Sequence, residues 1–384
     1  MIRFLGVPKR GMAYASDGLG RLFACQRDLE RAQALYTESL ALFEEVGDHW
    51  GRARALIHLA TTVSKQGNHA RALQLAGESL TLCHELGDRN AIAFVLTDLG
   101  WIKLACGDHD AAAALFAESL ARYRALTAWG GFVWAMDSLG EVLLQRGDYA
   151  GAERLFEEHV TLCQNAGYTA GIAWVRGMLG YAALLQGNYV RAAAAYTNSL
   201  ELYRALRQRG PLAWALFGLG EAVMWQGDLV RATQLFAESL ALYREVEDSR
   251  GTIAARCRLG YVAILQGDYR VGYDRLVESL ALRRTSDDKR DIALSLEGLA
   301  MAAVEQGNAE RALHLAGAAD ALRKSISAPL GGGERATLDL YLRQVRQAIG
   351  VEASESAWME GQAMSLEQAI AYALEDVDSA AGKS

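Results

Sequence analysis

The strongest constraint on this chain is an internal repeat of 40 residues, which runs from about Gly11 to Asp320 without insertion or deletion and gives eight units. A period of roughly 20–50 residues is typical of solenoids, propellers and arrays. In such proteins each unit buries its apolar face against its neighbours. The period is marked by Ser-Leu at 39–40, 79–80, 119–120, 199–200, 239–240 and 279–280, and by Leu-Gly at 19–20, 99–100, 139–140, 179–180, 219–220 and 259–260.

Each unit predicts two helices, here called helix A and helix B. Leu212, Leu216, Leu219 and Val223 follow spacings that mark one face of a helix A. A glycine follows helix A in seven units and can adopt the left-handed conformation that ends a helix. An Asp or Asn comes next in all eight units, and its side chain is suited to cap helix B. These residues are Asp28, Asn68, Asp108, Asp148, Asn188, Asp228, Asp268 and Asn308.

A further glycine lies inside helix A in six units, in a chain that has many glycines and few prolines, 38 against 3. A glycine within a helix costs about 1 kcal/mol relative to alanine. Close approach of helix B would offset that cost, and an alanine twelve residues later, as in Gly100 and Ala112, is the expected small partner.

The Leu-Gly pair of helix A, followed by Ala112, Phe116 and Ser119 in helix B, resembles the tetratricopeptide repeat. The 40-residue period departs from the usual length of about 34. The longer form and the C-terminal stretch resemble the sensor module of bacterial LuxR- and MalT-like regulators and signalling ATPases. The resemblance implies an all-α, right-handed α-solenoid. The expected organisation is an N-terminal extension (1–10), eight repeats (11–320), and a C-terminal helical cap and tail (321–384).

Composition and charge exclude several classes of function. The net charge is −7 and no run of Lys and Arg exceeds two, so nucleic acid is not an expected partner. No apolar stretch approaches the roughly 18 residues of a membrane span. The five cysteines form no CxxC pair, which favours a reducing, cytoplasmic compartment and no metal site. No GxxxxGK[ST] phosphate loop is present, and neither a cofactor nor a catalytic residue is predicted.

The tetratricopeptide resemblance implies a concave face lined mainly by helix A. Counted from the glycine inside helix A, or the small residue in its place, the groove positions are −6, −3, +1, +4 and +5. Five of the eight tryptophans fall on these positions, with acidic residues between them. The predicted ligand-binding residues are Phe94, Trp101, Trp134, Asp137, Glu141, Trp174, Tyr181, Trp214, Phe217, Glu221, Trp225 and Tyr261.

Aromatic side chains are frequent in binding hot spots, and an acid beside an aromatic ring suits a cationic or amphipathic ligand. The ladder of Trp134, Trp174 and Trp214 therefore predicts a groove, although the same residues could pack between neighbouring units. The expected function is a non-catalytic scaffold or sensor module that binds a peptide, a protein partner or an amphipathic small molecule. The alternatives are an enzyme that uses Asp137 and Glu141, and a purely structural oligomerisation scaffold.

Overall fold

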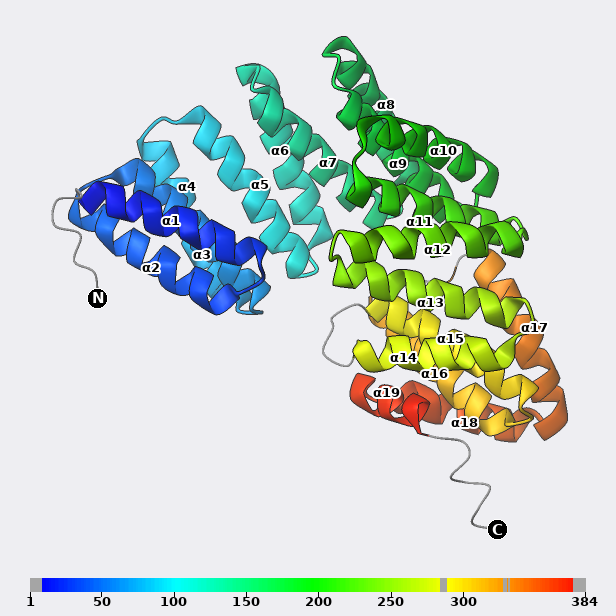
Figure 1. Ribbon diagram of the computed structural model, residues 1–384. Coiled ribbons are helices and arrows are strands. Elements are labelled where there is room, and N and C mark those ends of the chain that lie inside the picture. The colour runs from blue at the N-terminus through cyan, green and yellow to red at the C-terminus, as the bar shows by residue number, and fades with distance from the viewer. Residues whose placement is uncertain (1–8, 284–288, 327–329, 331, 376–384) are drawn as a thin grey trace. The chain divides into compact units, whose positions relative to one another are not determined.

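The computed structural model describes residues 9–283, 289–326, 330 and 332–375, and these residues form nineteen α-helices and no strand (Figure 1). The predicted all-α fold of stacked helix pairs is confirmed. Most of the predicted N-terminal extension and the last nine residues lie outside the described residues. None of the described helices is long and apolar enough to cross a membrane.

Sixteen helices form the eight predicted pairs, one pair in each repeat. The helices A are α1 (Lys9–Cys25), α3 (His49–Lys65), α5 (Arg89–Ala105), α7 (Trp129–Gln145), α9 (Thr169–Leu185), α11 (Arg209–Trp225), α13 (Ser249–Leu265) and α15 (Lys289–Glu305). The helices B are α2 (Leu29–Glu45), α4 (His69–Glu85), α6 (His109–Leu126), α8 (Tyr149–Asn165), α10 (Tyr189–Leu206), α12 (Leu229–Glu245), α14 (Tyr269–Leu282) and α16 (Ala309–Ser325). Three helices follow, α17 (Gly332–Ile349), α18 (Val351–Ala363) and α19 (Leu366–Leu374).

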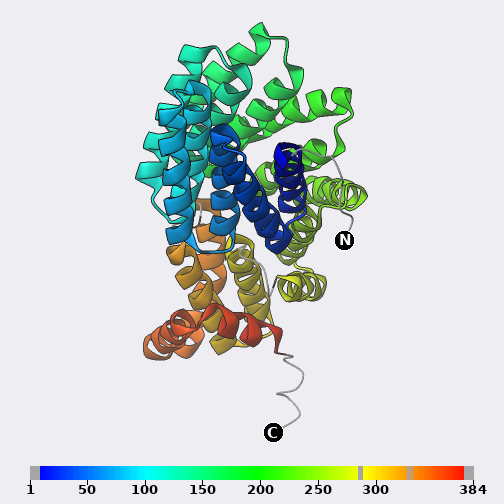
Figure 2. The same cartoon turned by 90° about the vertical axis from the view of Figure 1, so that its left-hand side faces the viewer.

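The chain divides into two compact units, Met1–Thr161 and Leu162–Ser384, with the division inside α8. In the first unit, α1 to α7 follow one another as neighbouring antiparallel helices (Figure 2). In the second unit, α9 to α16 do the same, and α18 packs along α16. The helices A of neighbouring repeats also contact one another within each unit, which places their exposed faces on one side of the stack.

The helix ends follow the predicted turn chemistry. In all eight repeats the Asp or Asn before helix B accepts a hydrogen bond from the backbone N–H three residues later. Gly67, Gly107 and their equivalents after helix A have positive φ, as expected for a helix-ending residue. Arg27 takes the same conformation in the first repeat. Every described repeat therefore begins helix B at the same register.

The glycine inside helix A allows close packing, but its neighbour is an aromatic ring rather than the expected alanine. A Cβ at Gly100 would lie 2.5 Å from the ring of Phe116. Tyr or Phe meets the glycine in the same way at 20, 140, 180 and 220. Ala112 is fully buried nearby. The missing Cβ therefore makes room for a large ring sixteen residues later, whose burial offsets the poor helix propensity of glycine.

The serine of the Ser-Leu pair ties the two helices of a repeat together. Its hydroxyl donates to a backbone carbonyl of helix A 26 residues earlier, as in Ser119 to Ala93 at 2.7 Å. The same bond recurs from Ser39, Ser79, Ser199, Ser239 and Ser279. His159 replaces the serine in the fourth repeat, is fully buried, and places Nδ1 3.1 Å from Asp137 Oδ1.

Candidate functional site

The first unit contains a cavity of about 820 Å³ on the side formed by the helices A. Side chains of α1, α3, α5 and α7 line it, with one residue each from α4 and α6. The volume lies within the range of roughly 300–1,000 Å³ that is usual for ligand sites. The lining includes predicted groove positions in four successive repeats.

Five aromatic side chains form much of the wall of this cavity: Trp50, Phe94, Trp101, Tyr123 and Trp134. The rings of Phe94 and Trp134 lie 5.5 Å apart, and Trp101 contacts Phe116 edge-on at 5.4 Å. Phe94, Trp101 and Trp134 are half-buried, so each packs against the fold and still reaches the cavity. The structure thus brings together three of the predicted binding residues.

A network of charges holds the α1 and α3 side of the cavity. The Asp17 carboxylate is buried, lies 3.1 Å from an Arg54 guanidinium nitrogen, and is 2.9 Å from His58 Nδ1. Burial alone would raise the pKa of Asp17, but the His58 hydrogen bond and the Arg54 charge bring it below its usual value. Arg54 also stacks on Tyr14 and Trp50, at 4.8 and 4.9 Å from the ring centres.

Asp98 lines the cavity but is not among the binding residues predicted from the sequence. It is an acidic side chain in a largely aromatic wall. It lies on α5 between Phe94 and Trp101, at the −2 position of the third repeat, and is half-buried. Burial raises the pKa of its carboxyl to about 7, and the charge of Lys65 opposes the shift. Within the described part of the chain, it makes no hydrogen bond and no ion pair within 4 Å. The −2 position lies outside the family's groove positions. The equivalent position is a small residue in most of the other repeats, so an acidic residue there was the only signal in the sequence that could have identified Asp98.

The other tryptophans of the predicted ladder lie in the second unit and divide between exposure and packing. Trp174 stacks on Trp214 with ring centres 5.2 Å apart, and 39% of Trp174 is exposed. Trp214 also meets Tyr196 edge-on and covers Gly177, where a Cβ would lie 2.2 Å from the indole. The packing alternative therefore describes Trp214 well, whereas Trp174 keeps a surface for contact.

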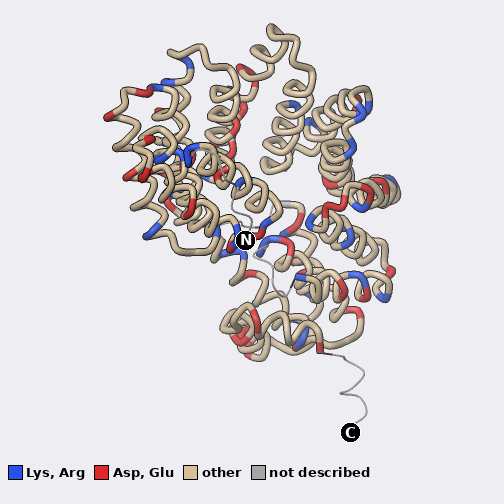
Figure 3. Tube along the Cα trace, turned by 60° about the vertical axis from the view of Figure 1, so that its left-hand side comes forward, with Lys and Arg blue, Asp and Glu red and all other residues tan. Residues whose placement is uncertain are grey.

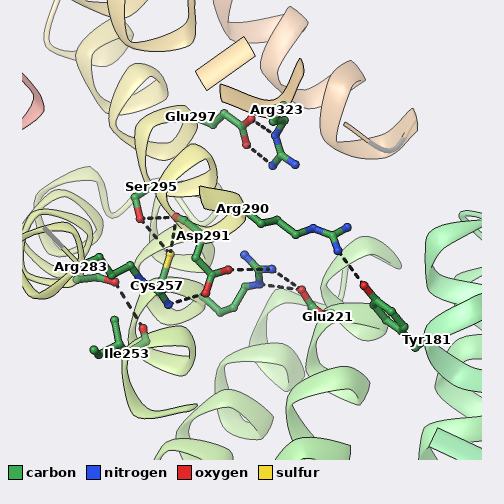
Figure 4. Close-up of polar contacts among 12 residues, drawn as sticks. Tyr181, Glu221, Ile253, Cys257, Arg283, Arg290, Asp291, Ser295, Glu297 and Arg323 are labelled. Carbon is green, nitrogen blue, oxygen red and sulfur yellow. Dashed lines mark hydrogen bonds and ion pairs between the residues drawn. The ribbon is translucent and has the colours of Figure 1, made fainter. Parts of the chain in front are cut away.

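Polar groups of the second unit converge on α13 and α15 (Figure 4). The predicted site residue Glu221 accepts from Arg258 at 2.6 Å, and Arg283 donates to Asp291 at 2.5 Å. Arg290 donates to the Tyr181 hydroxyl at 2.9 Å. Glu221 and Tyr181 are thus committed to contacts within the protein.

Tyr261 does not belong to a ligand-facing surface, because only 1% of it is exposed. Its ring lies against α15 at Gly298, where a Cβ would approach it to 3.3 Å, and lies 6.2 Å from the ring of Trp225. Phe217 and Trp225 remain half-buried, with Phe217 5.5 Å from Phe236. The side chain at the +1 position of the seventh repeat is therefore buried rather than exposed in the groove, and the Cβ space at Gly298 is filled mainly by Leu276, at 2.6 Å.

Asp137 and Glu141 lie one helical turn apart on α7. Asp137 faces the buried His159, and burial together with the charge of Asp137 raises the pKa of Glu141. Among the described residues, no group of three or more His, Cys, Asp or Glu could hold a metal ion. Basic and acidic residues are both scattered over the helices of each unit (Figure 3).

The sequence profile of the tetratricopeptide repeat matches residues 11–83, 51–125 and 132–205. The chain is a tetratricopeptide repeat protein. The matched residues cover the helices that form the cavity. No curated protein sequence matches this tetratricopeptide repeat chain.

Solved structures share this fold at low sequence identity. The apo form of RapI is 12% identical, with a TM-score of 0.60, covering 83% of this chain and 97% of its own. The Rap conjugation gene regulator of plasmid pLS20, in complex with the Phr* peptide, is 12% identical (TM-score 0.57; 90% and 100% covered). A signal transduction ATPase with a tetratricopeptide repeat sensor from Pyrococcus horikoshii is 13% identical (TM-score 0.57), covering 87% of this chain and 50% of the ATPase.

Proposed function

We propose that this chain is a binding scaffold of the sensor type, whose first-unit cavity holds an extended peptide or a segment of a protein partner. The observation that carries the proposal is the cavity of about 820 Å³ with five aromatic residues in its lining. Rigid aromatic surface loses little side-chain entropy on binding, and such residues dominate the energetics of recognition.

The arrangement of the lining supports a peptide as the occupant. The cavity is lined by the helices A of four successive repeats, so it is elongated along the stack of repeats. Stacked repeats provide extended concave surfaces of this kind. Solved structures of the same fold include the pLS20 regulator with its Phr* peptide and a Rap protein with Competence and Sporulation Factor. An amphipathic small molecule of similar size is the alternative occupant.

Replacing Trp101 or Trp134 with alanine is expected to lower peptide affinity about 10- to 30-fold each, because a buried aromatic contact is worth roughly 1–2 kcal/mol or more. Peptides are first selected from a random library against the wild-type protein. Their dissociation constants are then measured by calorimetry with each variant. Circular dichroism checks that helical content is kept, as expected for half-buried side chains.

Trp129→Ala is the matched control, because Trp129 lies in the same unit, is 39% exposed and does not line the cavity. Its affinity for the selected peptides should equal that of the wild type. Selected peptides that bind Trp101→Ala and Trp134→Ala unchanged would place the binding surface elsewhere. A thermal-shift screen of amphipathic compounds, with no peptide recovered, would favour the small-molecule alternative.

A further inference from the structure

We propose that Asp98 and its flanking rings form a subsite for a cationic group of the bound peptide, a lysine or arginine side chain or a free N-terminus. This inference rests on the proposed function, because it names the chemistry recognised within the same cavity. Asp98 lies four residues after Phe94 and three before Trp101, and residues at these spacings share one helix face. All three line the cavity, as does Trp134.

The repeat itself provides the comparison that singles out Asp98. Three residues at the −2 position of helix A have ionisable side chains: His58, Asp98 and Arg258. His58 is bound to Asp17, and Arg258 is bound to Glu221. Two of the three thus have an acidic partner supplied by another helix of the stack. Asp98 has no hydrogen-bond or ion-pair partner among the described residues, and like His58 it lines the aromatic cavity.

The other charges of the cavity wall are already used or lie in solvent. Arg54 is bound to Asp17, and Asp88 accepts from Trp50 Nε1 at 3.1 Å while capping α5. Arg21 and Lys65 have exposed side chains. Asp98 is half-buried and has no ion-pair partner among the described residues, and burial disfavours its charged form, so a ligand cation would stabilise the ionised carboxylate.

The rings beside Asp98 strengthen the same preference. A cation within about 6 Å of an aromatic face is attracted by the ring, and tryptophan is the strongest partner. Phe94, Trp101 and Trp134 offer such a surface near one carboxylate. This arrangement favours a ligand group that combines a positive charge with an apolar stem. The long side chains of lysine and arginine have this character.

The electrostatics of Asp98 agree with an anionic subsite. Burial raises its pKa to about 7, so the carboxyl changes its charge near neutral pH. The titratable groups around it are Lys65 and His58 from α3, Cys83 from α4, Tyr123 from α6 and Tyr36 from α2; from α7, no titratable side chain lines the cavity. Burial and the charge of Asp98 raise the pKa of Tyr123 to about 12. Cation binding would favour the ionised carboxyl and release a proton.

The test uses a random heptapeptide library selected in parallel on the wild-type protein and on Asp98→Asn. Wild-type selections should enrich Lys or Arg at one position, or depend on the free N-terminus, and selections on Asp98→Asn should not. The best cationic peptide is then synthesised with the cation replaced by a neutral residue, and with the N-terminus acetylated, which separates the two sources of charge. Asp98→Asn should weaken the cationic peptide at least about tenfold and the neutral one less than twofold.

Asp110→Asn is the control, because Asp110 is an exposed acid of the same unit and lies outside the cavity. Between pH 6 and pH 8, wild-type affinity for a peptide whose cation is Lys or Arg should rise, since the carboxyl of Asp98, with a pKa of about 7, loses its proton over this range. Asp98→Asn should show no such rise, which assigns the pH dependence to Asp98.

The outcomes distinguish the two proposals. Selected peptides that lack a cation, or a cationic peptide that binds Asp98→Asn as tightly as wild type, overturn the subsite and leave the scaffold function intact. If selection on the wild-type protein recovers no more peptide than selection on the Trp101→Ala and Trp134→Ala variants, the scaffold function is overturned. The subsite is then overturned with it.

Discussion

Replacing Arg323 with methionine should lower the free energy of unfolding by about 3–5 kcal/mol, because it leaves the Glu297 carboxylate buried without its counter-charge. Arg323 Nε and a second guanidinium nitrogen lie 2.5 and 2.8 Å from the two Glu297 oxygens, and both side chains are almost completely buried (Figure 4). The pair joins α15 to α16. Urea unfolding followed by circular dichroism measures the loss.

The double variant Glu297→Met with Arg323→Met separates the charge from the packing. Its stability should return to within about 1–2 kcal/mol of wild type, since a well-packed apolar pair often replaces a buried ion pair without loss. Arg204→Met is the control, as Arg204 and Glu238 form an exposed ion pair, which is worth at most about 1 kcal/mol. Equal effects of Arg323→Met and Arg204→Met would show that burial does not determine the contribution of the Glu297 pair.

Replacing Gly361 with alanine should destabilise the C-terminal helices by about 1–3 kcal/mol, because the added methyl group has no room. A Cβ at Gly361 would lie 2.2 Å from the backbone oxygen of His314, and one at Gly317 would lie 2.4 Å from that of Trp358. These two contacts run in opposite directions between α16 and α18. Backbone atoms cannot rotate away as a side chain can, so the helices must separate. Hydrogen exchange of α18 amides should become faster.

Gly77→Ala is expected to change the stability in the opposite direction. Gly77 lies in the middle of α4 with open space where its Cβ would be. Alanine there should stabilise the protein by about 0.5–1 kcal/mol through helix propensity alone. A destabilisation of similar size in both variants would show that the close approach of α16 and α18 does not limit substitution at Gly361.

Much of the fold could be predicted from the sequence because the repeat makes local signals coincide. The capping Asp or Asn, the helix-ending glycine and the apolar spacing recur together, so each unit supports the assignment of the next. Spacing also placed Phe94, Trp101 and Trp134 on corresponding faces of helix A, and these three residues line one cavity. These features depend on spacing along a helix, which the sequence carries directly.

The remaining features of the site depend on how neighbouring helices pack. The spacing of residues along one helix does not determine that packing. Tyr261 occupies a groove position but is buried, with its ring close to Gly298 of α15. Trp50 and Asp98 line the cavity from positions outside the family's groove set. His159 takes the place of a tying serine and turns to Asp137. Each case requires knowledge of the residue on the facing helix, which lies tens of residues away in the chain.

The hydrogen bond between the serine and the backbone carbonyl of helix A distinguishes structural positions within a repeat from positions that line the cavity. The serine, the ring that covers the glycine and the capping Asp or Asn build the frame, and none of the six tying serines lines the cavity. The cavity residues Phe94, Asp98 and Trp101 lie on helix A and take no part in the hydrogen bond between the serine and the backbone carbonyl. Ligand preference can therefore evolve by exchanging a few side chains, and duplication of one 40-residue unit would lengthen the recognition surface by one step while preserving the frame.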